Sequence, residues 1–239
     1  MFRHLLDQAA AGLIPPTCVL CGAPGSAGLD LCAACRDELP RNRPACPRCA
    51  LPLTAGMAPG APCGACQHHP PPQTIAFVPY LYRDTIRALI AGAKFRGRLN
   101  LARLLGLCLA YSAREAGVVR PDIILPVPLH PQRLQTRGYN QALEMARALS
   151  KELGIPVDAD TCVRLRAITP QEGLEKEARR RNVRGAFGVT APIRAQHVAL
   201  LDDVVTTGST AAEVTTTLLQ AGAKRVDLWA VARTPSLYC

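Results

Sequence analysis

The sequence predicts an α/β protein in which a parallel sheet carries helices on both faces, preceded by a small cysteine-rich module that binds metal. Two observations predict this organisation. After residue 73, short apolar segments typical of strands alternate with longer segments typical of helices, which is the pattern of βαβ units. Before residue 73, cysteine, proline and glycine dominate and no long periodic pattern appears. We therefore expect a metal-binding module with an N-terminal helix at residues 1–73 and a sheet domain at residues 74–239.

The elements of the sheet domain follow from apolar spacing and turn residues. Strands are predicted in five short apolar segments: Ile75–Tyr82, Asp122–Pro128, part of Val157–Ile168, Val198–Val204 and Val226–Ala232. Helices are predicted in four segments: Thr85–Ala93, Leu99–Ala116, Gln141–Leu153 and Ala211–Ala221. Asn140 is a candidate N-cap of the third helix, and Gly154 lies just past its end. The polar and charged segment Thr169–Arg184 predicts a long loop.

The positive charge of the chain comes almost entirely from arginine. The formal net charge is +10, and the sequence contains only four lysines. The planar guanidinium group suits phosphates, so the charge favours polyanionic partners such as nucleic acid, or anionic small molecules. A compositional bias of an arginine-rich and alanine-rich chain is the alternative explanation. No stretch approaches the ~20 apolar residues of a membrane helix, and no targeting signal is visible, so we expect a cytoplasmic protein without membrane insertion.

Eight of the eleven cysteines form four C-x-x-C pairs within the first third of the chain. A knuckle of this spacing turns the backbone so that both sulfur atoms face one ion, and two knuckles supply four thiolates for tetrahedral Zn²⁺. Paired spacing favours metal over disulfides. We predict two structural zinc ions, held sequentially by Cys18, Cys21, Cys32 and Cys35 and by Cys46, Cys49, Cys63 and Cys66. Interleaved pairing, or a single zinc ion, remains as an alternative.

The segment Val198–Thr210 carries the clearest chemical signal. Its apolar run ends at two adjacent carboxylates, Asp202 and Asp203, and a turn rich in hydroxyl groups then leads into a helix. Ligands in open parallel sheets sit beyond the C-terminal ends of strands, and the start of a helix attracts anions. The candidate phosphate ligands are Thr206, Thr207, Gly208, Ser209 and Thr210. The acids would repel phosphate, so we expect them to face ribose hydroxyls or Mg²⁺.

This segment resembles the phosphoribosyl pyrophosphate (PRPP) signature of type I phosphoribosyltransferases, in which an apolar strand precedes two acids and Thr-Thr-Gly-x-Thr. The resemblance implies a type I phosphoribosyltransferase-like sheet that binds PRPP together with Mg²⁺. It assigns Asp202 and Asp203 to the ribose hydroxyls and Thr206–Thr210 to the 5-phosphate.

Nearly the whole chain is also similar to the ComF family of competence proteins, with its ComFC-like and GntX-like members. The similar motifs are Cys18–Cys66 as a double zinc ribbon, Tyr82-Arg83 to Lys94–Gly97, Ile124–His130 with Arg137–Gln141, Arg179 with Asn182 and Gly185–Phe187, and Ala232–Thr234. That family is linked to DNA uptake during natural transformation and to the use of external DNA. The resemblance implies PRPP, single-stranded DNA and proteins of the DNA-uptake machinery as partners.

Four arginines are further candidates for anion binding. Arg133 and Arg137 follow the strand Asp122–Pro128, where phosphoribosyltransferases carry a pyrophosphate loop, and they could hold pyrophosphate through paired hydrogen bonds. Arg179 and Arg180 lie where that family has a mobile loop that closes over PRPP. These arginines could instead contact DNA phosphates, or simply be solvated.

Three functional hypotheses follow from these patterns. The first is a PRPP-binding protein of ComF type that acts in DNA uptake and binds single-stranded DNA. The second is a conventional phosphoribosyltransferase, which joins a base or an amine to PRPP and releases pyrophosphate. The third is a sensor that binds PRPP without consuming it and regulates a partner. No acceptor pocket can be read from the sequence, and no catalytic side chain is assigned.

Overall fold

The structure is a computed structural model that describes residues 15–54, 56–58, 60–95, 97–166 and 183–235. The chain forms two compact units, which divide between Leu39 and Pro40. The second unit contains the second cysteine group together with the sheet. The domain division after residue 73, which composition suggests, stays a prediction.

The first unit consists of turns around its cysteine pairs. In its described part, residues 15–39, the helix is α2 (Ala33–Asp37). An isolated β-bridge joins Thr17 to Pro24, and a second joins Ser26 to Leu29. A segment this short buries little apolar surface, so bound metal is expected to contribute much of its stability.

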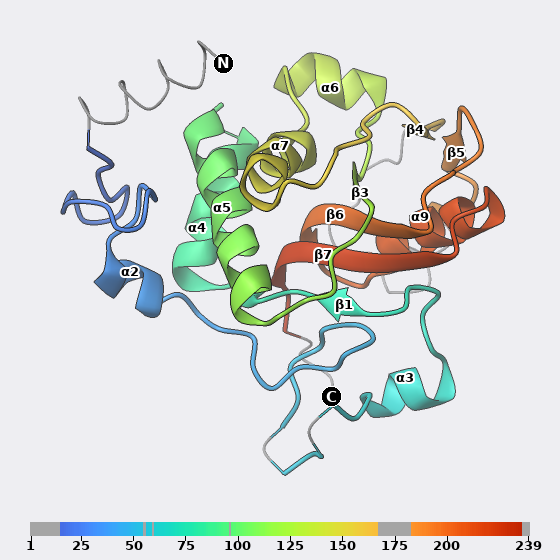
Figure 1. Cartoon of the computed structure of the whole chain (residues 1–239), viewed down its shortest axis with the longest axis horizontal. Coiled ribbons are helices and arrows are strands. Elements are labelled where there is room, and N and C mark those ends of the chain that lie inside the picture. Colours follow the sequence, from blue (N-terminus) through green and yellow to red (C-terminus); the bar gives the residue numbers. More distant parts are fainter. Residues whose placement is uncertain (1–14, 55, 59, 96, 167–182, 236–239) are drawn as a thin grey trace. The chain divides into compact units, whose positions relative to one another are not determined.

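The second unit is built on a parallel sheet whose strands come from distant parts of the chain (Figure 1). The strands are β1 (Ala76–Phe77), β2 (Tyr80–Leu81), β3 (Ile123–Pro126), β6 (His197–Val205) and β7 (Arg225–Arg233). Their order is β1–β7–β6–β3, with β2 also paired to β7. The central strands β6 and β7 are mostly apolar because helices cover both faces of a parallel sheet.

The helices of the second unit are α3 (Gly64–His68), α4 (Asp84–Phe95), α5 (Leu99–Glu115), α6 (Pro131–Arg137), α7 (Gln141–Leu153) and α9 (Ser209–Gln220). The N-cap predicted for α7 is confirmed, because Asn140 Oδ1 accepts a hydrogen bond from the Ala142 N–H at 3.0 Å. Gly154 ends the same helix, also as predicted.

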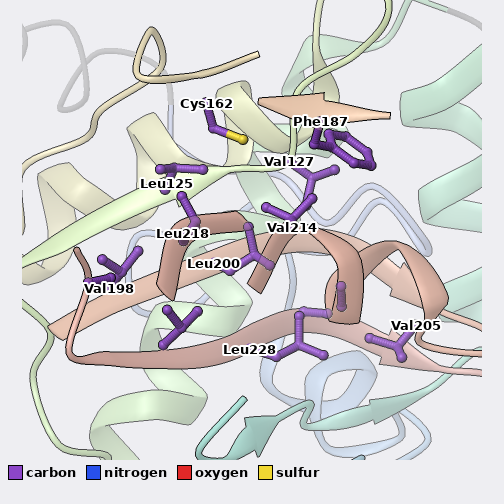
Figure 2. Close-up of a cluster of buried hydrophobic side chains, with 14 of the residues drawn as sticks. Leu125, Val127, Cys162, Phe187, Val198, Leu200, Val205, Val214, Leu218 and Leu228 are labelled. Atoms are coloured by element: carbon purple, nitrogen blue, oxygen red, sulfur yellow. The ribbon is translucent and has the colours of Figure 1, made fainter. Parts of the chain in front are cut away.

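Helices cover both faces of the sheet, which confirms the predicted fold class. On one face, Val214 and Leu218 of α9 belong to a single buried cluster with Leu200 of β6 and Leu228 of β7 (Figure 2). Side chains alternate along a strand, so the strand residues next to Leu200 and Leu228 point to the opposite face. On that face α7 contacts β3 and β6, and α5 contacts β7.

Two elements differ from the expectation. The single strand predicted at Ile75–Tyr82 is divided into β1 and β2, because Pro79 has no N–H to give to a neighbouring strand. Helix α6 follows β3 where a loop was predicted. None of its residues is buried, so apolar periodicity could not reveal it. Its local signals are an N-cap at His130, proline at the first helical position and Gly138 just past its end.

A small antiparallel pair completes the second unit. The strand β4 (Cys162–Arg164) pairs with β5 (Phe187–Val189), and β4 confirms the strand expected within Val157–Ile168. Most of the predicted loop Thr169–Arg184 lies outside the described residues. In the part of the chain that the structure describes, no helix combines the length and the apolar character that crossing a membrane requires.

Candidate functional site

The strand β6 leads through a tight turn into α9, and this turn borders a small pocket. Gly208 takes the left-handed conformation there, with φ of 77°, which glycine adopts without strain. Space is not the constraint, because a Cβ at this position would meet only Val205 Cγ1, at 3.9 Å. The pocket is lined by six of the seven predicted ligand residues: Asp202, Thr206, Thr207, Gly208, Ser209 and Thr210. The seventh, Asp203, is buried and does not line the pocket.

The start of α9 combines main-chain donors with hydroxyl groups. The N-cap residue, Gly208, has no side chain to bond the N–H groups of the first turn. Thr207 Oγ1 lies 2.9 Å from Ser209 Oγ and accepts a hydrogen bond from the Ser209 N–H at 3.4 Å. Aligned peptide dipoles add partial positive charge at the same end of the helix. This combination of groups suits a phosphate.

The two acids at the end of β6 have different surroundings. Asp202 borders the pocket, and its Oδ1 accepts a hydrogen bond from the Asp203 N–H at 2.8 Å. Burial, together with the nearby Asp203 carboxylate, raises the pKa of Asp202 to about 7, although Lys94 opposes the shift. A divalent cation beside Asp202 would favour its ionised form.

Asp203 is buried, with 4% of its surface exposed, and two polar groups hold it. Its Oδ2 accepts hydrogen bonds from Lys94 Nζ at 2.7 Å and from Gln141 Nε2 at 3.1 Å. A buried carboxylate requires such partners, because removing its charge from water is costly. Neither partner was predicted as a site residue. The available signal was that both lie in motifs similar to those of ComF proteins, Lys94–Gly97 and Arg137–Gln141.

Two further hydrogen bonds involve the motif Arg137–Gln141. The Tyr139 hydroxyl donates to the Ala93 carbonyl oxygen, which joins the start of α7 to the end of α4. Arg137 Nη1 donates to Gln141 Oε1 at 2.6 Å. The predicted anion ligand Arg137 is therefore connected to Asp203 through the side chain of Gln141.

Positive charge lies beside the pocket on two further elements. Burial lowers the pKa of Arg164, the last residue of β4, and the charge of Arg133 on α6 lowers it further while Asp202 raises it. Arg164 Nε is buried and has no hydrogen-bond partner among the described residues. No sequence motif marked Arg164. The other two predicted anion ligands, Arg179 and Arg180, lie outside the described residues.

Each cysteine group converges on one point. In both groups the four sulfur atoms lie within 4.8 Å of one another. The Sγ–Sγ distances of Cys21 to Cys32 and of Cys49 to Cys63 are 3.7 Å. Four Zn–S bonds of ~2.3 Å in a tetrahedron would separate the sulfur atoms by ~3.8 Å. The sequential pairing is confirmed, and both groups of four thiols fit a structural Zn²⁺.

Main-chain donors favour the thiolate form of Cys46 in the second group, whereas burial raises the pKa of Cys49 to about 11. Burial raises the pKa of Cys46, but N–H groups of Cys63, Arg48 and Cys49 outweigh it and bring the pKa to about 7. The bond from the Cys63 N–H to Cys46 Sγ is 3.3 Å long. Zinc binds thiolates, so these donors lower the cost of releasing the Cys46 proton when metal binds.

The second cysteine group is attached to the sheet. Asn42 Nδ2 donates to the carbonyl oxygens of Ala50 at 2.9 Å and of Val78 at 3.0 Å, and so joins the knuckle to the segment between β1 and β2. The Ala76 N–H donates to the Pro47 carbonyl oxygen at 2.8 Å. The methyl group of Ala50 also belongs to the buried cluster of the sheet. This zinc ribbon is therefore part of the unit that carries the pocket.

Comparison with known proteins agrees with the two cysteine groups. A family model described as a double zinc ribbon domain matches residues 9–67. The DNA utilization protein YhgH of Escherichia coli O157:H7 is 36% identical over 226 residues, which are 92% of this chain and 98% of the relative. Competence protein F of Haemophilus influenzae is 32% identical over 212 residues, which are 85% of this chain and 90% of the relative. The chain belongs to the ComF family.

Solved structures are more distant matches to this ComF protein. Glutamine PRPP amidotransferase from B. subtilis, complexed with ADP and GMP, is 20% identical with a TM-score of 0.36, and the match covers 54% of this chain and 25% of that one. Purine phosphoribosyltransferase from Pyrococcus horikoshii is 24% identical with a TM-score of 0.32, and the match covers 56% of this chain and 83% of that one. The scores are low, so the fold of the ComF chain is established by its own strand order and helices.

Proposed function

We propose that this ComF protein binds PRPP with Mg²⁺ at the end of β6. The pocket supports the proposal most directly, because six of the seven signature residues line it at the uncapped start of α9. Thr206–Thr210 would hold the 5-phosphate, and Asp202 would hold a ribose hydroxyl or the Mg²⁺ ion. Asp203 remains a proposed ribose ligand. Its Oδ2 is occupied by Lys94 and Gln141, so Oδ1 is the oxygen left for a ligand.

The pyrophosphate group of the same ligand would lie toward the arginines. Arg133 and Arg164 supply positive charge on the side of Asp202, and a bound anion would relieve the repulsion between the two guanidinium groups. Arg137 would contribute from the end of α6. Arg179 and Arg180 keep the role proposed from the sequence, in which their loop approaches the bound ligand.

Calorimetric titration of Mg²⁺ and PRPP into the zinc-loaded protein tests this function. We expect saturable binding, and we expect Thr207→Ala or Asp202→Asn to weaken it at least about tenfold, the factor that corresponds to ~1.4 kcal/mol. Thr216→Ala is the matched control, because Thr216 lies on the exposed side of the same helix and is not a pocket residue. If the titration of the intact protein shows no saturable binding, the proposal is contradicted.

We further propose that this PRPP-binding protein acts in the cytoplasm in DNA uptake and natural transformation, with single-stranded DNA and DNA-uptake proteins as partners. The names of the relatives, DNA utilization protein and Competence protein F, support this role. A net charge of +10, carried almost entirely by arginine, also supports it. Binding of labelled oligonucleotides should weaken steeply as salt rises, because phosphate contacts release counterions. Lack of binding even at low salt would count against a DNA partner.

A transferase reaction is the second candidate, and the charges at Arg133 and Arg164 favour it because a leaving pyrophosphate would need them. Release of pyrophosphate from PRPP in the presence of a panel of bases and amines tests this reaction. Binding without turnover for every acceptor would instead favour a sensor, whose affinity for a partner should change when PRPP binds.

A further inference from the structure

Arg233 is a buried charged side chain at the end of β7 that the proposed function does not yet use. Only 7% of its surface is exposed. Its guanidinium group donates hydrogen bonds to main-chain carbonyl oxygens of three separate segments: from Nε to Cys49 at 3.1 Å, and from Nη1 to Val205 at 3.1 Å, to Thr206, and to Thr234 at 2.8 Å. One side chain thus joins the second zinc ribbon to the turn that begins the phosphate pocket.

The bond to Cys49 ties Arg233 to the metal-binding group. The Cys49 sulfur is one of the four that converge on the second zinc site, so bound metal would fix the main chain at this residue. Asn42 holds the next carbonyl, that of Ala50. Without metal, no ion joins the four sulfur atoms and the knuckle loses its main constraint. The position of the Cys49 carbonyl oxygen is therefore expected to depend on metal occupancy.

The bonds to Val205 and Thr206 act on the pocket. A peptide group is planar, so holding its carbonyl oxygen also fixes the direction of the N–H that follows it. Arg233 therefore orients the N–H groups of Thr206 and Thr207, which open the phosphate-binding turn. Donors that are already aligned bind an anion without first paying the cost of ordering the turn.

We propose that Arg233 is a positioning residue that couples metal in the Cys46, Cys49, Cys63 and Cys66 group to the geometry of the turn Thr206–Ser209. The coupling rests on the proposed function, because it takes that turn to be the phosphate site of PRPP. Arg233 touches neither the metal nor the ligand in this scheme. It transmits the position of the Cys49 carbonyl oxygen to the first two N–H groups of the turn.

The test compares the wild-type protein with Arg233→Lys, each with zinc bound and after treatment with a zinc-selective chelator at constant Mg²⁺. A lysine ammonium group is too compact to bond the carbonyl oxygens of both Cys49 and Thr206. We expect zinc removal to weaken wild-type PRPP binding about tenfold, and we expect zinc-loaded Arg233→Lys to show a loss of the same size. Zinc removal should then have much less effect on Arg233→Lys, because the two changes break the same connection.

Amide hydrogen exchange gives a readout that needs no ligand. Zinc removal and Arg233→Lys should each speed exchange at Thr206 and Thr207. Asn42→Ala removes only the bonds to the Ala50 and Val78 carbonyl oxygens, and zinc and Arg233 still hold Cys49, so both amides and PRPP affinity should stay nearly unchanged. Equal losses of affinity on zinc removal in wild type and in Arg233→Lys would overturn the coupling. Unchanged exchange at the turn in both altered states would also overturn it. If wild type itself failed to bind PRPP, the proposed function would fail, and the exchange comparison would still decide the coupling.

Discussion

The two zinc-ribbon groups have the same ligands and very different surroundings. Both consist of two C-x-x-C pairs with sulfur atoms that converge within 4.8 Å. Hydrogen bonds of the first group join turns of the unit at residues 15–39 to one another. The second group is bonded to the sheet through Asn42 and to the turn Thr206–Ser209 through Arg233. If the proposed function holds, the same metal chemistry stabilises a small unit in one place and supports a ligand site in another.

The difference is visible at the residue that follows the first C-x-x-C pair of each group, Gly22 in the first and Ala50 in the second. Both positions require the left-handed conformation, with φ of 76° at Gly22 and 55° at Ala50. A Cβ at Gly22 would meet nothing within 4 Å, whereas Ala50 is 1% exposed and packs in the core of the sheet. In the second ribbon, Ala50 accepts backbone strain and its methyl group contributes to the core. In the first ribbon, Gly22 adopts the same conformation without strain.

Removing zinc ligands of the second group should have the largest effect on both stability and PRPP binding. Cys46→Ser with Cys49→Ser should destabilise the sheet unit by more than about 3 kcal/mol, since a structural zinc site contributes ~10 kcal/mol to folding in isolated zinc fingers. PRPP binding should be lost together with this stability. Thermal unfolding and calorimetric titration measure the two effects.

Cys18→Ser with Cys21→Ser is the matched change in the first group. It should release one zinc ion and leave PRPP affinity within about twofold, a difference of ~0.4 kcal/mol. Equal loss of PRPP binding in both pairs of variants would show that the two groups do not differ in the way proposed.

Asn42→Ala should have a smaller effect, because it removes one connection between the second knuckle and the sheet. Two buried carbonyl oxygens, those of Ala50 and Val78, would lose a donor, and an unsatisfied buried group costs about 1–3 kcal/mol. We expect denaturant unfolding to show a loss of about 2 kcal/mol with zinc still bound. Thr17→Ala is the control in the first unit, where the exposed hydroxyl makes one long bond to Pro15. A stability loss below that of Thr17→Ala would mean that this connection does not matter.

Asp202 is expected to lower the stability of the ligand-free protein at neutral pH, because its carboxyl group is held for a ligand and not for folding. Its pKa is raised to about 7 by burial and by Asp203, above the ordinary value of 3.8. The folded state therefore binds the proton more tightly, and stability falls as pH rises from about 4 to about 7. Asp202→Asn should then stabilise the ligand-free protein at pH 8 by about 1–2 kcal/mol, allowing for partial solvent screening.

The gain from Asp202→Asn should disappear below about pH 4, where the carboxyl group is protonated in both states. Thermal unfolding across this pH range measures it, and Asp160→Asn, an exposed acid outside the pocket, is the control. A gain that stays constant with pH would mean that the charge of Asp202 is not its cause.

The sequence predicted those parts of the site that are local. Asp202 and Thr206–Thr210 lie in one contiguous segment, and the cysteine pairs have short spacings, so both could be read without a fold. Lys94, Gln141 and Arg233 could not be assigned, because their bonds to Asp203, Cys49 and Thr206 join residues far apart in the chain. Such contacts depend on which strands become neighbours, and periodicity carries no information about that. Helix α6 was missed for a different reason, since it buries no side chain.

The smallest predicted effect comes from exchanging the residues that follow the two knuckles. Ala50→Gly relieves left-handed strain of about 1 kcal/mol, but it gives up a buried methyl group worth ~0.8 kcal/mol and adds the entropic cost of glycine, ~0.7 kcal/mol. The net expectation is a loss of about 0.5 kcal/mol in denaturant unfolding of the sheet unit. Gly22→Ala has no core to gain, so strain alone should weaken zinc binding in the first group about threefold, ~0.7 kcal/mol in a chelator competition. If Ala50→Gly stabilised the protein instead, the methyl group would not be contributing to the core. The second ribbon would then be held by its hydrogen bonds to Asn42 and Arg233, and not by packing against the sheet.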